Sequence, residues 1–471
     1  MENFNFWDSE VWGSFDLFAV LLASLLLANS LKKMIPWLKR SLIPSSVLGG
    51  LLLLAASVIY EAATGTVMFN TSFFGGDGLG RLEVLTYHCL ALGFIATTLK
   101  PSAEKFNKER GNEIFNTGVA TVATYLLQGI LGIAISVVAA LIVKDLFPAA
   151  GALLPFGYGQ GTGQALNYGN IYEQEHGFIG GRSFGLTIAA LGFLSASIGG
   201  VIHLQLLRRK GLKYDWNQGE EESKALTLQE IQGQDEIPMN GSIDKLTMQL
   251  VLVCIAYLIA YGIMALLGSL IPSLQSILYG FNFLLGVLAA MLVKAVHNFL
   301  RKKKLVKRNH ISGFLMTRLS GFFFDVMIVA GIAAIRLQVL SQYWPLILIL
   351  GVVGALSTYF YTHFVAKSLF PAYAEEQFMA TYGMLTGTAS TGIILLRALD
   401  PEFKTPASEN LVYQNFPAIV FGFPMMLLAI IAPEQPILTI LIMTAFFAVL
   451  NVILFRRRIF RRSDIKKRRK K

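Results

Sequence analysis

Two stretches of this sequence place glycine beside hydroxyl and amide side chains in otherwise apolar surroundings. Residues 157–173 read GYGQGTGQALNYGNIYE and residues 382–397 read YGMLTGTASTGIILLR, each between long apolar segments. Glycine interrupts helices and lets another group approach the backbone closely. A broken helix exposes free N–H groups, which suit an anion such as a carboxylate, and free C=O groups, which suit Na⁺. The two stretches are therefore candidate ligand sites.

The residue types divide into those that turn the backbone and those that offer oxygen or nitrogen. Gly159, Gly161 and Gly163 in the first stretch, with Gly387 and Gly392 in the second, would allow the turns. The predicted substrate-binding residues are Gly159, Gln160, Gly161, Thr162, Gly163, Gln164, Gly387, Thr388, Ser390, Thr391 and Arg397. The predicted Na⁺ ligands are Thr162, Asn167, Thr386, Thr391 and Asp325. The alternative is that the small residues serve helix packing alone.

Each charged or titratable residue inside an apolar run has a functional and a structural interpretation. Asp325 lies well within GFFFDVMIVAGIAAIRL and could hold a cation or pair with a basic residue. Arg397 could grip a substrate carboxylate, or it could reach from the membrane interface to water. His88 is expected to be packed or hydrogen-bonded, with a proton-linked role as the alternative. Arg182 and Arg336 are expected at the interface.

The composition indicates which elements must position these residues. The chain has 471 residues, of which 54% are hydrophobic and only 15% charged, whereas soluble proteins have about 25% charged residues. Many apolar runs reach the roughly 20 residues needed to cross a bilayer, and the alternating pattern of a β-barrel is absent. This predicts an all-α polytopic membrane protein with spans near 15–31, 43–60, 82–99, 117–143, 183–207, 247–270, 274–296, 319–338, 344–366, 411–432 and 435–455.

The positive charge indicates orientation. The net charge is +11, and basic residues cluster at the ends of spans, as in 32–40, 301–308 and 456–471. This pattern is typical of cytoplasmic loops and argues against nucleic-acid binding. An outside N-terminus and a cytoplasmic C-terminus keep nearly every cluster inside, provided that both glycine-rich segments, 148–176 and 371–398, are re-entrant hairpins.

That arrangement predicts two inverted five-helix repeats, each with one re-entrant hairpin. The first repeat covers 1–210 and the second 247–432; 433–471 adds one extra helix and a basic tail. Residues 146–163 and 369–389 share an LFPA opening and a Tyr-Gly pair. Inverted repeats of this kind mark secondary transporters. Residues 211–246 are predicted to be a cytoplasmic linker.

No motif of an enzyme or of a nucleotide or metal cofactor site is present, so neither an enzyme nor an organic cofactor is expected. Cys89 and Cys254 both lie in apolar runs, which does not indicate a disulfide framework.

Four segments resemble the bacterial sodium/glutamate symporter family. They are IPSSVLGGLLLL (43–54), GQGTGQA (159–165), FGLTIAALGFLSASIGG (184–200) and TGTASTGI (386–393). Gly161, Thr162, Gly387 and Thr391 match the family's two glycine-rich motifs. Tyr158 and Gln160 stand where the family has Gly and His, and Ala389 and Ser390 where it has Thr and Pro. The extra C-terminal span also departs from the family's ten-helix pattern.

The resemblance implies Na⁺-coupled uptake of glutamate, or a related acidic amino acid or dicarboxylate, with Na⁺ as the coupling ion. It further implies a homodimer in the bacterial inner membrane and an elevator-type transport domain. Three alternatives stay open: a Na⁺/H⁺ antiporter using Asp325 and His88, a passive ion channel, and a membrane scaffold or sensor acting through 211–246.

Overall fold

The computed structural model describes residues 5–101, 108–210, 236, 244–272, 275–401 and 403–456. Within these ranges the chain is helical, and its one extended pairing is an isolated bridge between Glu236 and Asn309. The all-α class predicted from the sequence is confirmed. Most of the predicted linker, and the tail from residue 457 onward, lie outside the described residues.

Ten described helices are long and apolar enough to cross a membrane. They form because apolar runs of this length must satisfy every backbone N–H and C=O internally when lipid surrounds them. They are α1 (Ser9–Met34), α3 (Ser45–Thr64), α4 (Gly78–Leu99), α5 (Lys108–Ile142), α8 (Gly181–Arg209), α10 (Lys245–Leu270), α12 (Asn282–Lys302), α13 (Gly313–Ala333), α14 (Trp344–Leu369) and α19 (Pro436–Leu454).

The span predicted at 411–432 is instead a bent pair, α17 (Ala407–Tyr413) and α18 (Asn415–Ile431). The two segments meet at 51°. Pro417 accounts for the break, because it lacks an N–H donor and its ring clashes with the carbonyl four residues earlier. Counted as one span, the pair brings the possible total to 11.

The chain divides into two compact units. Unit 1 comprises residues 1–28, 48–105 and 220–334, and unit 2 comprises 29–47, 106–219 and 335–471. Each half of the sequence thus contributes helices to both units. The first half gives α4 to unit 1 and then α5 and α8 to unit 2, whereas the second gives α10, α12 and α13 to unit 1 before α14 enters unit 2.

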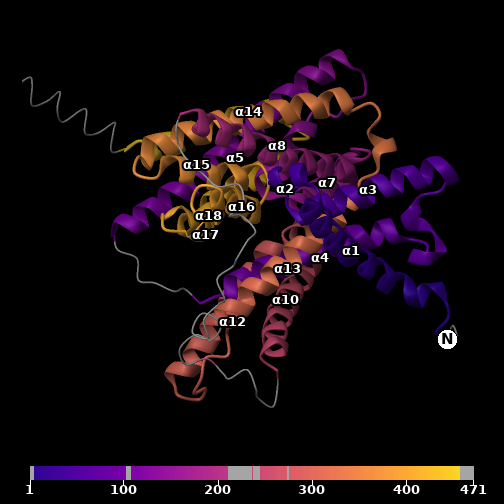
Figure 1. Ribbon diagram of the computed structural model, residues 1–471, viewed down its shortest axis with the longest axis horizontal. Helices are drawn as coiled ribbons and strands as arrows, with labels where there is room; N and C mark the ends of the chain where they lie inside the picture. Colours follow the sequence, from indigo (N-terminus) through magenta and orange to yellow (C-terminus); the bar gives the residue numbers. More distant parts are fainter. Residues whose placement is uncertain are drawn as a thin grey trace, which may run out of the picture. The chain divides into compact units, whose positions relative to one another are not determined.

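Unit 1 is centred on α4, against which α12 and α13 pack (Figure 1). Its core joins Ile95 and Leu99 to Val253 and Met316. The hydroxyls of Thr97 and Ser320 share a hydrogen bond of 2.7 Å between α4 and α13. At the end of α4, Lys294 Nζ donates to the carbonyls of Thr98 and Lys100, where a cation offsets the negative end of the helix.

Unit 2 contains both glycine-rich segments. The first consists of η3 (Ala150–Leu153), α6 (Leu154–Gln160) and α7 (Thr162–His176); the second consists of α15 (Ala374–Leu385) and α16 (Ala389–Arg397). In Figure 1 α15 to α18 gather beside α5. The short elements α2 (Pro36–Arg40), η1 (Met68–Asn70), η2 (Ser72–Phe74), α11 (Gln275–Gly280) and η5 (Leu337–Leu340) complete the described secondary structure.

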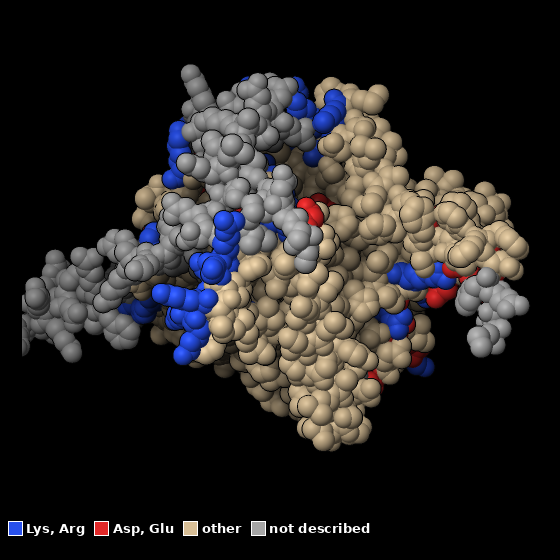
Figure 2. Space-filling view, turned by 90° about the horizontal axis from the view of Figure 1, so that it is seen from below, with Lys and Arg blue, Asp and Glu red and all other residues tan. Residues whose placement is uncertain are grey.

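The charged side chains are unevenly distributed. Figure 2 shows wide areas of one face with no Lys, Arg, Asp or Glu, and Lys and Arg gathered in a few places. Large apolar side chains are exposed on most of the long helices, among them Leu258 and Phe360. An apolar surface on long helices is what a lipid-facing protein needs, so the structure and the composition agree on a multi-pass membrane protein.

Candidate functional site

The first glycine-rich segment breaks at Gly161, between α6 and α7. Gly161 has φ +82° and ψ −172°, a region that is essentially restricted to glycine. Two residues earlier, a Cβ on Gly159 would lie 2.2 Å from Cε1 of Tyr125, so any larger residue there would force the Tyr125 ring to move. The positive φ of Gly161 agrees with the predicted turn. The close approach at Gly159 is made by Tyr125, whereas the sequence predicted that a ligand would approach there.

The second segment breaks over Thr386–Thr388, between α15 and α16. A Cβ on Gly387 would lie 2.9 Å from Oγ1 of Thr391 and 3.0 Å from Cδ1 of Phe193 on α8. Thr388 then takes an extended conformation, with φ −140° and ψ 172°, and opens α16. The break is therefore held by α8 on one side and by its own helix on the other.

The two breaks meet inside unit 2. A Cβ on Gly161 would be 3.2 Å from Cγ2 of Thr388 and 3.7 Å from the carbonyl oxygen of Gly387. These residues are more than 220 positions apart in the sequence. The predicted site residues around Gly161 and around Gly387–Thr388 thus form one group.

Helices α5 and α8 fix this group in place. The Tyr125 hydroxyl donates to the Gly159 carbonyl at 3.1 Å, and Gln128 Nε2 donates to the Leu385 carbonyl at 2.9 Å. On the α8 side, the Tyr382 hydroxyl donates to the Ser195 carbonyl, also at 2.9 Å. The first two bonds satisfy carbonyls at the ends of α6 and α15, and the third satisfies a buried hydroxyl; leaving such groups unpaired would be costly.

Two helix N-termini face the meeting point. Neither Gly161 at the start of α7 nor Thr388 at the start of α16 caps its helix with a side-chain hydrogen bond. The first N–H groups of a helix have no partner within it, and together they carry about half a positive charge. Paired N-termini of this kind suit a carboxylate.

A buried amide lies in the same place. Gln164, in the first turn of α7, is 1% exposed, and neither its Nε2 nor its Oε1 has a hydrogen-bond partner among the described residues. Leaving such a group unpaired costs about 1–3 kcal/mol. An amide that can both donate and accept is thus available to a ligand.

Backbone carbonyl and side-chain hydroxyl oxygens also lie at the two breaks. The C-terminal ends of α6 and α15 present backbone carbonyls, and the hydroxyls of Thr388 and Thr391 lie 3.4 Å apart. Thr162 and Thr386 are fully buried, with the Thr386 hydroxyl donating to the Tyr382 carbonyl. Carbonyls and hydroxyls at a broken helix are the groups that coordinate Na⁺ in transporters.

The remaining predicted residues differ in burial and in their distance along the chain from the breaks. Gln160 is half-buried at the end of α6, Gly163 and Asn167 are buried on α7, and Ser390 is exposed on α16. Arg397 is exposed at the far end of α16, where its guanidinium lies 5.3 Å from the ring centre of Phe403. Asp325 is an exposed residue of α13 in unit 1.

The histidine and arginine predicted for other roles have ordinary partners. His88 Nδ1 shares a hydrogen bond of 2.7 Å with the Tyr257 hydroxyl on α10, as expected of a hydrogen-bonded residue. Arg182 Nε donates to Asn170 Oδ1 at 3.0 Å, at the start of α8.

A cavity that was not predicted from the sequence lies near the second break. It lies between α5, α14 and α15 and is lined by Thr117, Ala120, Thr121, Thr124, Thr362, Val365, Ala366, Phe370, Gln377, Thr381 and Leu385. Five of these residues are threonines, and the Thr121 hydroxyl is buried without a partner among the described residues. The sequence signal for this cavity is the TGVATVAT run at 117–124 within an apolar span. Hydropathy alone does not show whether such small and hydroxyl residues line a cavity or pack against another helix.

Asp400 was also missed, in the connection that follows α16. Its carboxylate accepts hydrogen bonds from the backbone N–H groups of Lys404 and Thr405, both at 2.8 Å, and from the Thr405 hydroxyl at 2.6 Å. Burial alone would raise the pKa of this carboxyl, but these hydrogen bonds outweigh it and hold the pKa below its usual value.

Comparison with known families decides the assignment of the chain. Residues 13–376 match the family model described as sodium/glutamate symporter. The chain belongs to the sodium/glutamate symporter family. The match covers well over half of the 471 residues and includes the first break, at Gly161, whereas the second break lies beyond it. No curated protein gives a significant match. The membership suggests Na⁺-coupled glutamate transport, and the family is one of transporters, not enzymes.

Proposed function

We propose that this member of the sodium/glutamate symporter family couples Na⁺ entry to the uptake of glutamate or a related acidic amino acid or dicarboxylate. The observation that carries the proposal is the meeting of Gly161 with Gly387 and Thr388. It puts two uncapped helix N-termini and two carbonyl-bearing helix ends in one place. The N-termini would hold the substrate carboxylate, and the carbonyls and hydroxyls would hold Na⁺.

Adjacency of the two ligands explains coupling. Na⁺ bound among carbonyls and hydroxyls lowers the electrostatic cost of placing a carboxylate beside them. By linkage, the substrate raises the affinity for Na⁺ by the same factor. Of the candidates, Thr162, Thr386 and Thr391 would coordinate Na⁺, and Gln164 would bind the substrate.

The same proposal includes the larger architecture. Both glycine-rich segments would be re-entrant hairpins of two inverted repeats, meeting from opposite faces of the membrane. Unit 2 would be the transport domain of an elevator mechanism, because it contains both breaks and is compact in itself. A homodimer in the bacterial inner membrane, with the N-terminus outside, completes the proposal.

The test is uptake into proteoliposomes. We expect glutamate accumulation that requires an inward Na⁺ gradient. Accumulation independent of the gradient would overturn the symport mechanism, proton flux without an organic substrate would indicate an antiporter, and unsaturable currents would indicate a channel.

Matched glycine variants link this activity to the breaks. Gly161→Ala introduces a side chain at a glycine-only conformation, which costs of order 1–3 kcal/mol, and Gly387→Ala meets Thr391 and Phe193. Both should lower uptake about tenfold or more, since 1.4 kcal/mol corresponds to a factor of ten. The control is Gly262→Ala, where the Cβ has open space. Normal uptake by both break variants would contradict the site.

A further inference from the structure

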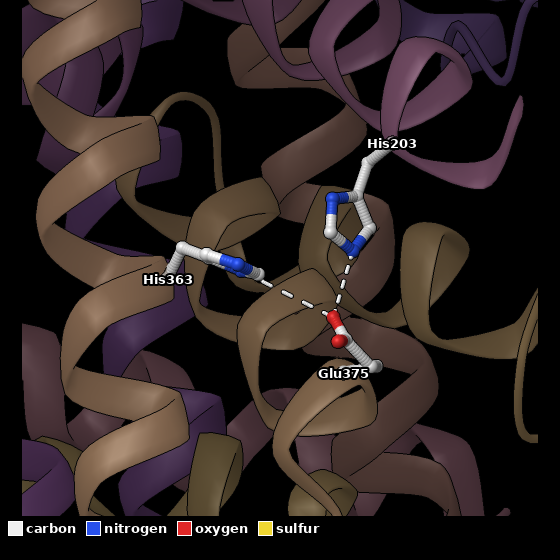
Figure 3. A group of neighbouring side chains, drawn as sticks. All are labelled: His203, His363 and Glu375. Atoms are coloured by element: carbon white, nitrogen blue, oxygen red, sulfur yellow. Dashed lines mark hydrogen bonds and ion pairs between the residues drawn. The ribbon is translucent and has the colours of Figure 1, made fainter. Parts of the chain in front are cut away.

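A group of three metal-ligating side chains lies in unit 2, apart from the glycine breaks. His203 comes from α8, His363 from α14 and Glu375 from the first turn of α15 (Figure 3). One ligand atom from each lies within 4.8 Å of the other two. Figure 3 shows both imidazoles directed toward the carboxylate of Glu375.

The distances suit a small cation after adjustments of about half an ångström. His203 Nε2 is 2.9 Å from Oε2 of Glu375, and His363 Nδ1 is 4.0 Å from the same oxygen. Zn²⁺ binds nitrogen and oxygen at about 2.0–2.2 Å, so tetrahedral ligands stand roughly 3.4 Å apart. The His203–Glu375 pair must therefore open by about 0.5 Å and the His363–Glu375 pair must close by about 0.6 Å. The side chains of His363 and Glu375 are 25% and 26% exposed, which allows both adjustments.

His363 supplies a second observation that points to a ligand. Its Nδ1 is buried and has no hydrogen-bond partner among the described residues. Buried polar atoms are normally hydrogen-bonded. A cation between the three side chains would satisfy this nitrogen, which the Glu375 carboxylate at 4.0 Å does not.

The surroundings of His203 resemble the outer shell of a metal site. Its Nδ1 shares a hydrogen bond of 2.8 Å with the Tyr359 hydroxyl. Nε2 shares a hydrogen bond of 2.9 Å with Glu375 Oε2. A metal ion would replace that proton: with Nδ1–H donating to the tyrosine hydroxyl, the Nε2 lone pair would be directed at the ion, and such bonds orient metal-ligating histidines. The ring is further held by Phe378, whose centre lies 4.4 Å from that of His203.

Neighbouring charges limit the affinity without blocking the site. Lys367 Nζ lies 4.0 Å from the other oxygen of Glu375, and Lys210 also acts electrostatically on both histidines. Both cations oppose metal binding. The partial exposure of Glu375, at 26%, leaves an entry path for an ion.

We propose that His203, His363 and Glu375 form a binding site for a divalent transition metal of the Zn²⁺ class. Two imidazoles and one carboxylate favour such a metal over Mg²⁺ or Ca²⁺, which prefer oxygen ligands alone. The fourth position is left to water. The bound ion ties the first turn of α15, which leads to the second glycine break, to α8 and α14. This metal site does not depend on the identity of the transported substrate.

Metal binding to the tag-free, full-length protein tests this site. Titration with Co²⁺ should give the absorption bands of tetrahedral coordination. Zn²⁺ should displace the bound Co²⁺ and should raise the thermal unfolding temperature of the protein. His363→Ala removes the ligand that has no other hydrogen bond, so it should preserve the fold and abolish both signals. His176→Ala, a histidine outside the group, should leave them unchanged.

Two further variants separate coordination from structure. Tyr359→Phe retains every ligand but removes the outer-shell bond, and should weaken Zn²⁺ binding about 10- to 100-fold. Glu375→Gln should remove the Co²⁺ bands. Absence of saturable binding to the wild-type protein, or equal Co²⁺ bands in wild type and His363→Ala, would overturn the proposal.

Discussion

The side chain of Gln164 permits the sharpest test at the level of single residues. It is buried in the first turn of α7, and both polar atoms of its amide lack a partner among the described residues. If the amide serves only structure, Gln164→Leu should be neutral or stabilising, because it removes an unsatisfied group. If it binds substrate, the variant should stay folded and lose a hydrogen bond to a charged ligand.

We expect the second outcome. A hydrogen bond to a charged group contributes about 1.5–3 kcal/mol, so Na⁺-dependent glutamate uptake by Gln164→Leu should fall at least tenfold at low substrate. The thermal unfolding temperature of this variant should be equal to or higher than that of the wild type. Gln174→Leu, at an exposed position of the same helix, serves as control. Unchanged uptake by Gln164→Leu would remove this residue from the site.

Asp400 gives a prediction about stability at the same scale. Asp400→Ala removes a carboxylate that accepts three hydrogen bonds in the connection between α16 and α17. Bonds of this kind contribute roughly 1 kcal/mol each, so protease cleavage near 400–405 should become faster. Because the folded pKa of Asp400 is lowered, its contribution is present above the unfolded pKa and is lost as the pH falls through the folded pKa. Equal cleavage rates in variant and wild type at neutral pH would contradict this role.

At the scale of elements, close packing of α15 against α16 depends on glycine. A Cβ on Gly392 would lie 2.4 Å from the Ala380 carbonyl oxygen, and one on Gly383 would lie 2.8 Å from Gly392 Cα. Helix propensity alone favours alanine over glycine by about 1 kcal/mol. At Gly392 the contact with backbone atoms makes alanine destabilising instead, because backbone atoms cannot move away without separating the two helices.

Gly392→Ala should therefore destabilise the protein by about 1–3 kcal/mol and reduce uptake. Gly262→Ala, in open space on α10, should be neutral or stabilising. Thermal unfolding of the two variants, measured side by side in one detergent, gives the comparison. A stabilised Gly392→Ala would show that α15 and α16 do not pack this closely.

The elements also show what a single sequence can and cannot predict. Apolar runs predicted the ten long helices of the described residues, since lipid-exposed backbone has few alternatives to a helix. The runs at 274–296 and 319–338, however, are displaced by five to eight residues from α12 and α13. The 411–432 run was predicted as one span because hydropathy does not register the break before Pro417. The contact between Gly161 and Thr388 could not be predicted, because it is a tertiary contact. The charge pattern and the internal repeat predicted two opposed hairpins, but not which of their residues touch. His203, His363 and Glu375 were not predicted, because no local spacing links residues from three helices.

For the whole molecule, the remaining prediction concerns topology. The proposed arrangement puts both ends of the first glycine-rich segment outside and both ends of the second inside. A full crossing by either segment would place every later connection on the opposite side. Cysteine labelling distinguishes these cases, because the chain has only Cys89 and Cys254 to remove first.

Four single-cysteine variants suffice, each at an exposed position: Lys144→Cys, Glu175→Cys, Lys303→Cys and Lys404→Cys. In intact cells, a membrane-impermeant maleimide should label the first two and leave the last two unlabelled until the membrane is opened. Labelling of Lys144→Cys but not Glu175→Cys would make the first segment a full crossing. Labelling of Lys404→Cys with Lys303→Cys still protected would make the second segment one. Either result would remove the inverted repeats, because two five-helix units have opposite orientations only when both hairpins return to the side from which they enter.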